Sequence, residues 1–132
     1  MVIYLDSAAI VKLVHEESES QALRDWLADR SEIGWVSSVL AEVESFRALA
    51  RHAPEAIARL PPVLDLIDLV DLDTRIRTLA QSITPVSVRS LDVIHLATAL
   101  HVRAELVSFV TYDHRLADAA KAAGLTIDAP GQ

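Results

Sequence analysis

Apolar and polar residues alternate along this chain in two patterns, short apolar runs and longer stretches with helical spacing. A run such as Val2–Leu5 predicts a strand, and apolar residues spaced three and four apart predict a helix. The short helix that begins at Pro54 is expected to end before Pro61-Pro62. In chain order the patterns predict strands at residues 2–5, 33–36, 66–72, 106–111 and 125–127, and helices at about residues 7–16, 18–29, 38–52, 54–60, 73–83, 90–103 and 114–123.

This order of strands and helices predicts an α/β fold. Consecutive parallel strands need crossover connections, and the crossover helices cover both faces of the sheet. We therefore expect a three-layer α/β/α sandwich with a central, mainly parallel sheet. The chain has 132 residues and shows no internal repeat, low-complexity tract or linker, so residues 1–132 are expected to form a single domain.

Composition narrows the class of protein. Hydrophobic residues make up 52% of the chain, which supports a buried core and argues against disorder. The chain contains no cysteine, which excludes disulfides, zinc–thiolate sites and thiol nucleophiles and fits a reducing cytoplasm. No apolar run approaches the length of about 18 residues that a membrane helix needs. We expect a soluble, cytoplasmic protein that does not bind a membrane.

The net charge of −7 is a weaker guide to function. A domain that holds nucleic acid through bulk electrostatics is usually basic, so the charge argues against that mode of binding. It does not exclude a nuclease, because cations bound by acidic residues would reverse the local field that a phosphate meets.

Four acidic residues carry the candidate chemistry: Asp6, Glu44, Asp92 and Asp113. Asp6 directly follows the first predicted strand, and Asp113 follows the strand at residues 106–111 by two positions. Functional groups in parallel sheets collect at the carboxyl ends of the strands, which places both residues at one rim. Glu44 and Asp92 are expected in helices that could line the same rim. Gathered carboxylates repel one another unless a cation lies between them, so such a cluster would be a metal site.

Each acid also has an ordinary structural explanation. Asp6 and Asp113 stand where helix N-caps are expected, Asp92 would complement a helix dipole, and Glu44 could be a solvated helix residue. Asp92 favours the metal site, because its helix is apolar on nearly every side and should be buried, and buried carboxylates are usually paired or metal-bound. Glu42 and Glu44 face about 200° apart on their helix, so only one can point at the site. Glu44 is the expected choice, with Glu42 pointing outward.

Four segments around these acids have the order and spacing of a known family. They are Ile3-Tyr4-Leu5-Asp6-Ser7-Ala8-Ala9 with Val11-Lys12-Leu13, Ser38 with Glu44-x-x-Arg47-Ala48-Leu49, Arg89-Ser90-Leu91-Asp92-Val93-Ile94-His95-Leu96-Ala97-Thr98-Ala99-Leu100, and Thr111-Tyr112-Asp113-x-Arg115-Leu116 with Ala119-Ala120-x-x-x-Gly124. With these segments the chain resembles PIN-domain ribonucleases, specifically the VapC-type toxins of bacterial toxin–antitoxin pairs. The resemblance covers nearly the whole length.

The resemblance implies a compact α/β sandwich whose acids bind Mg²⁺ or Mn²⁺ and hydrolyse RNA. Carried over position by position, it gives the catalytic and metal-ligand roles to Asp6, Glu44, Asp92 and Asp113. It also implies a toxin that inhibits translation by cleaving RNA and that a cognate VapB-type antitoxin neutralises. Such toxins form homodimers and join larger hetero-oligomers in which the antitoxin binds operator DNA, so contact with DNA would be indirect.

Several polar residues near the acids are candidates to orient a ligand or to contact phosphates. They are Ser7, Thr111, Arg47, Arg89 and Arg115, with Lys12 as a further basic residue. Ser7 is equally suited to capping a helix, and isolated basic residues are usually only solvated.

A structural role is the favoured interpretation of three aromatic residues. His95 lies one turn beyond Asp92 and could be a ligand or general base, but on so apolar a helix a hydrogen-bonded core histidine is favoured. Trp26 and Trp35 are expected in the core or in an interface, with base stacking as the lesser alternative.

Other functions fit part of the pattern. The same fold could serve as a PIN-domain nuclease in RNA processing. A non-enzymatic acidic α/β binding module would use its carboxylates only as caps, and its stability would not depend on divalent ions. A receiver-like or phosphatase-like domain also has an Asp after its first strand, but this chain lacks a second acid next to Asp6 and a lysine after a late strand.

Overall fold

The computed structural model describes residues 1–132 and contains a five-stranded sheet in which all neighbouring strands are parallel. The strand order across the sheet is β3-β2-β1-β4-β5. The strands are β1 (Val2–Leu5), β2 (Gly34–Ser38), β3 (Ile67–Val70), β4 (Leu106–Val110) and β5 (Ile127–Asp128). The prediction of a mainly parallel sheet is confirmed.

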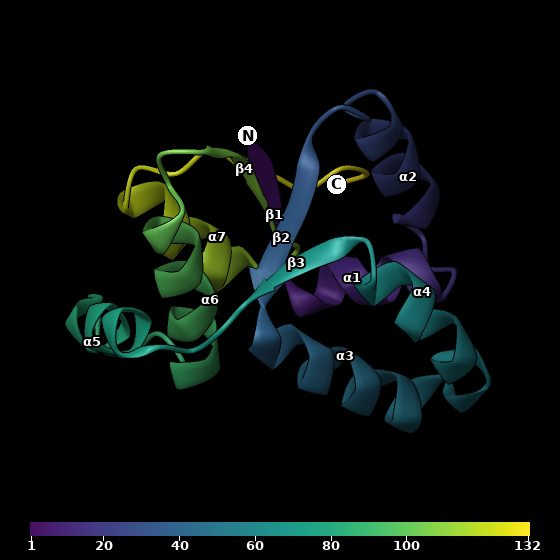
Figure 1. Ribbon diagram of the computed structural model, residues 1–132, viewed down its shortest axis with the longest axis horizontal. Helices are drawn as coiled ribbons and strands as arrows, with labels where there is room; N and C mark the ends of the chain where they lie inside the picture. Colours follow the sequence, from purple (N-terminus) through teal and green to yellow (C-terminus); the bar gives the residue numbers. More distant parts are fainter.

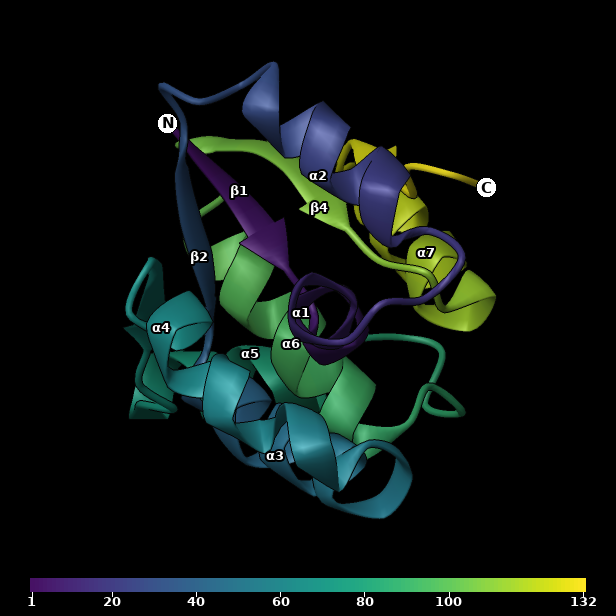
Figure 2. The same cartoon turned by 90° about the vertical axis from the view of Figure 1, so that its right-hand side faces the viewer.

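Helices cover both faces of this sheet (Figures 1 and 2). They are α1 (Ser7–Val14), α2 (Ser20–Ala28), α3 (Val39–His52), the 3₁₀ helix η1 (Pro54–Arg59), α4 (Leu60–Leu64), α5 (Thr74–Ser82), α6 (Ser90–His101) and α7 (His114–Ala122). In Figure 1, α1, α2 and α4 lie on one side of the strands, and α6 and α7 lie on the other, where α5 packs against α6. This arrangement is the three-layer sandwich that the sequence predicts.

Two hydrophobic clusters, one on each face of the sheet, form the core. Alternate residues of β1 point to opposite faces, as side chains of a strand must. Ile3 and Leu5 join the cluster under α1, α2 and α3, while Tyr4 joins Phe109 in the cluster under α6 and α7. All four of these side chains are fully buried. A strand this apolar on both faces needs a helical layer on each side.

The structure differs from the sequence prediction at two boundaries. The 3₁₀ helix η1 ends at Arg59, before Pro61-Pro62 as expected, but α4 then begins at Leu60 with both prolines in its first turn. A first-turn N–H has no intrahelical partner, so proline is tolerated there. The strand predicted at residues 33–36 lies at Gly34–Ser38, because Trp35 to Ser38 pair with Ile67 to Val70 of β3.

The topology places one rim of the sheet at the centre of the molecule. The chain moves from β1 to β2 and β3 on one side and later returns to β4 and β5 on the other. Leu5 at the end of β1 pairs with Val110 at the end of β4, so the segments after these strands emerge side by side. Ligands of open α/β sheets bind at such a switch point. No helix combines the length and the apolar character needed to cross a membrane.

Candidate active site

Asp6 lies at the switch point, directly after β1. It is the N-cap of α1, where its Oδ1 accepts a hydrogen bond of 2.9 Å from the Ala9 N–H. The residue is 4% exposed, and burial raises the pKa of its carboxyl above the usual range. The Thr111 hydroxyl opposes that shift, and the charge of Glu44 adds to it. Asp6 is therefore both a cap and a carboxylate held where its charge is unfavourable.

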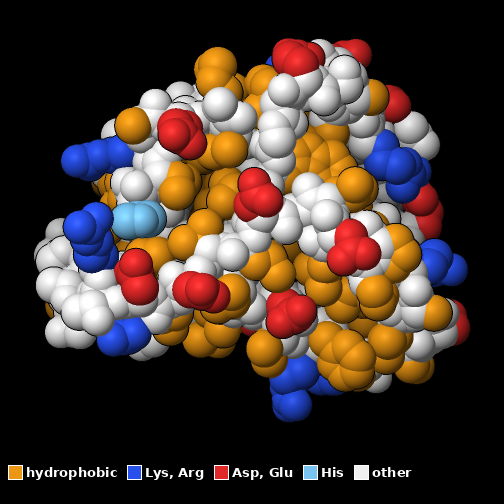
Figure 3. All heavy atoms as spheres, in the orientation of Figure 1, with side chains coloured by type: hydrophobic (Ala, Val, Ile, Leu, Met, Phe, Trp, Pro, Cys, Tyr) orange, Lys and Arg blue, Asp and Glu red, His pale blue; other side chains and the backbone are white.

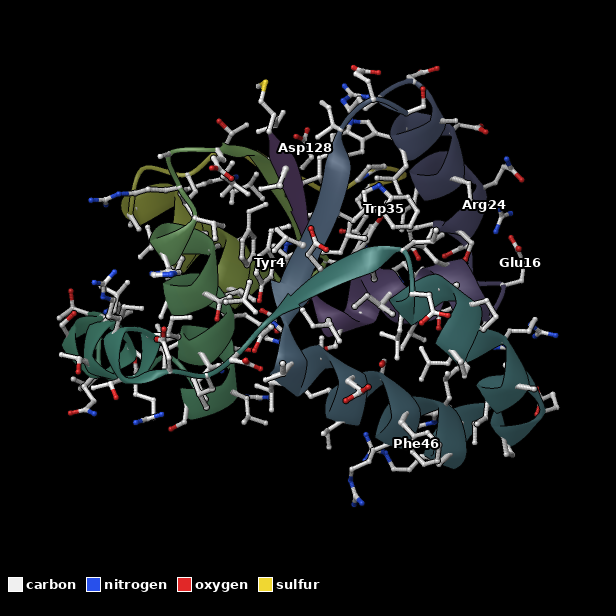
Figure 4. All side chains as sticks on the ribbon, viewed as in Figure 1. Tyr4, Glu16, Arg24, Trp35, Phe46 and Asp128 are labelled. Atoms are coloured by element: carbon white, nitrogen blue, oxygen red, sulfur yellow. The ribbon has the colours of Figure 1, made fainter.

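Glu44 reaches the same region from α3, which follows β2. Its Oε1 lies 2.6 Å from Nε2 of His95, a residue of α6. The other ring nitrogen of His95, Nδ1, lies 2.6 Å from the Tyr4 hydroxyl. Tyr4 projects from β1 on the side of the sheet that faces α6 (Figure 4). The prediction that His95 is a hydrogen-bonded core histidine is confirmed, and its carboxylate partner is one of the four acids.

Asp92 lies in the first turn of α6 and is only half-buried. The expectation that apolar neighbours bury the whole helix is wrong for this turn, because Leu91 is 50% exposed and full burial begins at His95. Desolvation still raises the pKa of the Asp92 carboxyl, and the charge of Asp113 raises it further. The charges of His95 and Arg89 act in the opposite direction.

Asp113 caps α7 beyond the end of β4 and is exposed. Its Oδ1 accepts hydrogen bonds from the N–H groups of Arg115, at 2.8 Å, and Leu116, at 3.0 Å. The buried Thr111 connects this corner to the first acid. Its Oγ accepts a hydrogen bond from the Asp113 N–H at 3.2 Å, and the same hydroxyl lowers the pKa of Asp6.

The fold therefore brings the four predicted acids to one rim, where each interacts electrostatically with at least one other. The charge of Glu44 contributes to the raised pKa of both Asp6 and Asp92, and the charge of Asp113 contributes to that of Asp92. As the side chains stand, no group of three or more acidic or histidine residues is arranged to hold a single metal ion. Mutual repulsion of like charges favours such spreading.

The donor set suits a hard divalent cation. All four acids supply carboxylate oxygens, the ligands that Mg²⁺ and Mn²⁺ prefer. The capping bonds of Asp6 and Asp113 use Oδ1 only, so Oδ2 of each carboxylate accepts no hydrogen bond from the chain. A cation placed between the acids would remove the repulsion that raises the pKa of Asp92.

A cleft of about 410 Å³ opens beside the acids, between α1, α3 and the start of α6. Ser7, Glu44, Arg47, Arg51 and Leu91 are among the residues that line it. The two arginines stand one turn apart on the exposed side of α3 and place positive charge beside the acidic rim. In this cleft a predicted acidic residue, Glu44, and a predicted basic residue, Arg47, share a surface.

Glu42 lies on another side of α3 and is exposed. With Phe46 it lines a neighbouring groove of about 620 Å³ between α3, η1 and α4, which shares Val43 and Arg47 with the cleft. Phe46 is 49% exposed and projects away from the sheet (Figure 4). The choice of Glu44 rather than Glu42 as the inward-facing acid is confirmed as a matter of geometry.

The other basic candidates for contact with phosphate lie in three different environments. Lys12 is not free for phosphate, because its Nζ lies 2.8 Å from a Glu17 oxygen and 3.1 Å from a Glu19 oxygen. Arg89 is exposed at the start of α6, and its charge opposes the rise in the pKa of Asp92. Arg115 lines a different cavity together with residues of the loop before α6.

The two tryptophans pack against the core, in agreement with their structural interpretation. Trp26 and Trp35 are partly buried and contact the cluster on the α1 side of the sheet. The guanidinium of Arg30 stacks over the Trp26 ring at 4.0 Å from its centroid. Neither residue lines the cleft beside the acids.

The sequence reasoning missed two residues of this region. Arg51 follows Arg47 by four positions, and this helical spacing alone would have placed both on one surface. Tyr4 carries no such signal, because an aromatic residue in a strand is ordinary core material. Its contact with His95 joins positions 91 residues apart and arises only from the fold.

Comparisons with known proteins show the family and the fold of this chain. Residues 3–122 match the PIN domain family. Ribonuclease VapC35 of Mycobacterium tuberculosis is 47% identical over 133 residues, covering 99% of this chain and 98% of the relative. Ribonuclease VapC46 of the same species is 44% identical over 128 residues, covering 97% of each chain. The crystal structure of VapBC2 from Rickettsia felis, bound to a DNA fragment from their promoter, contains a chain with the same fold, with a TM-score of 0.78, 10% identity and coverage of 98% and 99%.

Proposed function

The chain belongs to the PIN-domain family, and from this premise we propose that it is a divalent-metal-dependent endoribonuclease. It acts as the toxin of a toxin–antitoxin pair, inhibits translation by cleaving RNA, and is neutralised by a cognate VapB-type antitoxin. Relatives of nearly equal length that carry the name ribonuclease support the activity. The cofactor is Mg²⁺ or Mn²⁺.

The observation that carries this proposal is the convergence of four carboxylates at the carboxyl ends of β1 and β4. An acid as buried as Asp6, with a pKa raised by burial, gains nothing for stability by ionising in that position. A cap alone needs no burial and no neighbouring acids. The arrangement makes sense when the carboxylates bind a cation.

Each acid has a role that follows from its position. Asp6 and Asp92 would hold the ion, and Glu44 and Asp113 would supply further carboxylate oxygens or orient the water that attacks phosphorus. When bound, the cation lowers the pKa of a water ligand and stabilises charge on the phosphate. The Thr111 hydroxyl favours the ionised form of Asp6 and so opposes, without cancelling, the rise in pKa that burial causes.

The substrate backbone lies in the cleft lined by Arg47 and Arg51. On the face seen in Figure 3, acidic side chains lie across the middle and most lysines and arginines lie at the edges. With a net charge of −7, the protein relies on local contacts and the bound cation to attract phosphate. Arg89, Arg115 and Ser7 are secondary candidates for contact with RNA or with bound water.

The assembly we propose is a homodimer that joins the antitoxin in a larger hetero-oligomer. The Rickettsia felis chain of the same fold was crystallised as VapBC2 bound to a DNA fragment from their promoter, which supports an antitoxin partner. We propose that contact of this chain with DNA is indirect, through the antitoxin. The compartment is the cytoplasm, where RNA and antitoxin are available, and residues 1–132 act as one domain.

The decisive test compares wild-type protein with Asp92→Asn on total cellular RNA. In Mg²⁺ or Mn²⁺ the wild type is expected to give discrete fragments, and EDTA or the substitution should abolish them. Asp118→Asn, which neutralises an exposed acid on α7, is the matched control and should cleave normally. Equal cleavage by wild type and Asp92→Asn would contradict the assignment. A folded wild type without cleavage would favour the acidic binding module.

A further inference from the structure

A continuous hydrogen-bonded path runs from the core of the sheet to the acidic rim. The Tyr4 hydroxyl lies 2.6 Å from Nδ1 of His95, and Nε2 of His95 lies 2.6 Å from Oε1 of Glu44. Tyr4 and His95 are buried, whereas the Glu44 side chain is 23% exposed and borders the cleft. The path thus ends on the one acid of the four that comes from a mid-helix position and caps nothing.

The direction of the two hydrogen bonds can be assigned from their partners. A carboxylate only accepts, so the contact with Glu44 requires a proton on Nε2. A neutral ring then has a bare Nδ1, which accepts the Tyr4 proton. Burial raises the pKa of Tyr4 far above its ordinary value, so its hydroxyl keeps that proton. The nearby hydroxyls of Ser37 and Thr98 already donate to the backbone carbonyls of Leu5 and Ile94.

We propose that Tyr4 and His95 are positioning residues that orient the Glu44 carboxylate toward the other three acids, with Tyr4 selecting the Nε2–H tautomer of His95. This inference rests on the proposed function, because it assigns Glu44 a place around the cation. The Tyr4 ring is itself fixed, since it stacks on Phe109 with 4.9 Å between centroids and 8° between planes.

The physical need for such a device follows from the position of Glu44. Its side chain has three rotatable bonds on an exposed stretch of α3, and holding it in one rotamer costs conformational entropy. Repulsion from Asp6 and Asp92 favours rotation toward solvent. A hydrogen bond from a rigid, buried donor opposes both effects, and bonds to a charged acceptor are the stronger kind.

The competing view is that His95 only fills space in the core. An isosteric apolar residue would then serve as well, so His95→Leu should leave the site intact. His95→Gln places an amide donor near the position of Nε2 and should restore the bond to Glu44. Tyr4→Phe keeps the stacked ring and removes only the hydroxyl, and therefore tests the choice of tautomer.

The test measures Mn²⁺ affinity by calorimetry, RNA cleavage, and thermal stability for wild type, His95→Leu, His95→Gln and Tyr4→Phe. Ser108→Ala is the matched control, because it breaks another 2.6 Å bond between a buried hydroxyl and a carboxylate, Asp128, in the body of the sheet. Loss of the His95 donor is expected to weaken Mn²⁺ binding and cleavage by about 10–100-fold. His95→Gln should recover most of that loss, and Ser108→Ala should lower stability without changing Mn²⁺ affinity.

Nitrogen-15 NMR of the wild-type histidines supplies a readout that does not depend on activity or on any variant. His95 should show the Nε2–H tautomer at neutral pH, and Tyr4→Phe should populate the other tautomer. A wild-type His95 that carries a proton on Nδ1 and none on Nε2 would overturn the proposal, even if His95→Leu fails to fold. So would Mn²⁺ affinities that are equal in wild type, His95→Leu and Tyr4→Phe.

Failure of the proposal is distinguishable from failure of the proposed function. If the Mn²⁺ affinities of wild type and variants follow the expected order but the wild type cleaves no RNA, the positioning role stands and the ribonuclease activity is contradicted. If the wild type cleaves RNA and His95→Leu equals it in cleavage and Mn²⁺ affinity, the ribonuclease activity stands and the positioning role is contradicted.

Discussion

Asp6 and Asp73 occupy the same local position in two regions of the molecule. Each follows a parallel strand closely and caps the next helix, and in each the Oδ1 accepts a 2.9 Å hydrogen bond from the N–H three residues on. Asp6 follows the central strand β1 and is buried, with a raised pKa, whereas Asp73 follows the edge strand β3 and is exposed.

This difference shows that a cap and a catalytic acid can be the same residue type in the same local sequence context. A cap depends on a few neighbouring residues and forms wherever a strand leads into a helix. A metal ligand depends on what other elements bring to the same point. Three other acids, from α3, α6 and the segment after β4, lie at the end of β1. None of these three acids lies beside Asp73.

The largest effect expected from this comparison is on catalysis. Asparagine caps helices as well as aspartate does, so Asp6→Asn and Asp73→Asn both keep the cap and remove one charge. Asp6→Asn should reduce RNA cleavage by at least about 100-fold, the upper end of the range for residues that only support a ligand. Asp73→Asn should cleave at the wild-type rate in the same assay. Equal losses in both variants would show that position in the sheet does not matter.

The next effect is on stabilisation by metal. Mn²⁺ at about 100 times its Kd should raise the free energy of unfolding of the wild type by about 2.7 kcal/mol, because it binds only the folded protein. Thermal unfolding with and without Mn²⁺ measures this shift. Asp73→Asn should show the same shift, and Asp6→Asn should show little or none. An Asp6→Asn protein stabilised as strongly as the wild type would remove Asp6 from the ligands.

A third comparison uses the two glutamates of α3. Glu44→Gln should lower cleavage by about 10–100-fold, the range typical of groups around a metal site, because it loses the charge that faces Asp6 and Asp92. Glu42→Gln changes an exposed residue that does not line the cleft beside the acids and should have no effect. Single-turnover cleavage of one RNA by both variants provides the measurement. A stronger effect of Glu42→Gln would reverse the assignment of the inward-facing acid.

The smallest expected effect is a pH dependence of stability in metal-free protein. The folded-state pKa of Asp6 is raised, so the native state binds its proton more tightly than the unfolded chain does. The protonated form of Asp6 therefore contributes its full stabilisation below the pKa that Asp6 has in the unfolded chain. This contribution is lost as pH rises through the pKa that Asp6 has in the native state. Asp6→Asn cannot ionise, so its stability relative to wild type should increase from acidic to neutral pH.

Denaturant unfolding at several pH values in EDTA checks this sign, with Asp73→Asn as the control for loss of a cap charge. A stability difference between Asp6→Asn and wild type that is constant with pH, or that shrinks toward neutral pH, would contradict the prediction. Asp92 has the same direction of shift, so Asp92→Asn should follow the same course.

Local patterns predicted most of the fold because they depend on residues close in sequence. The caps Ser38, Asp73 and Asp113 lie at the starts of the helices that the sequence indicates. The errors lie where neighbours in space decide. Pro61-Pro62 lie in the first turn of α4 instead of only following the end of the previous helix, and the first turn of α6 is open to solvent although its sequence is apolar. What covers a helix cannot be read from the helix itself.

The sequence by itself determined the order of elements, the parallel sheet, the family resemblance and the four acids, since strand and helix periodicity, caps and local motifs are properties of short segments. Only the tertiary structure decided that Lys12 is held by Glu17 and Glu19, that Arg47 and Arg51 border the acids, and that Tyr4 reaches Glu44 through His95. These contacts join different elements, and their geometry is fixed by how the helices pack on the sheet. Hydrogen bonds and charges act over a few ångströms in space, whatever the separation along the chain.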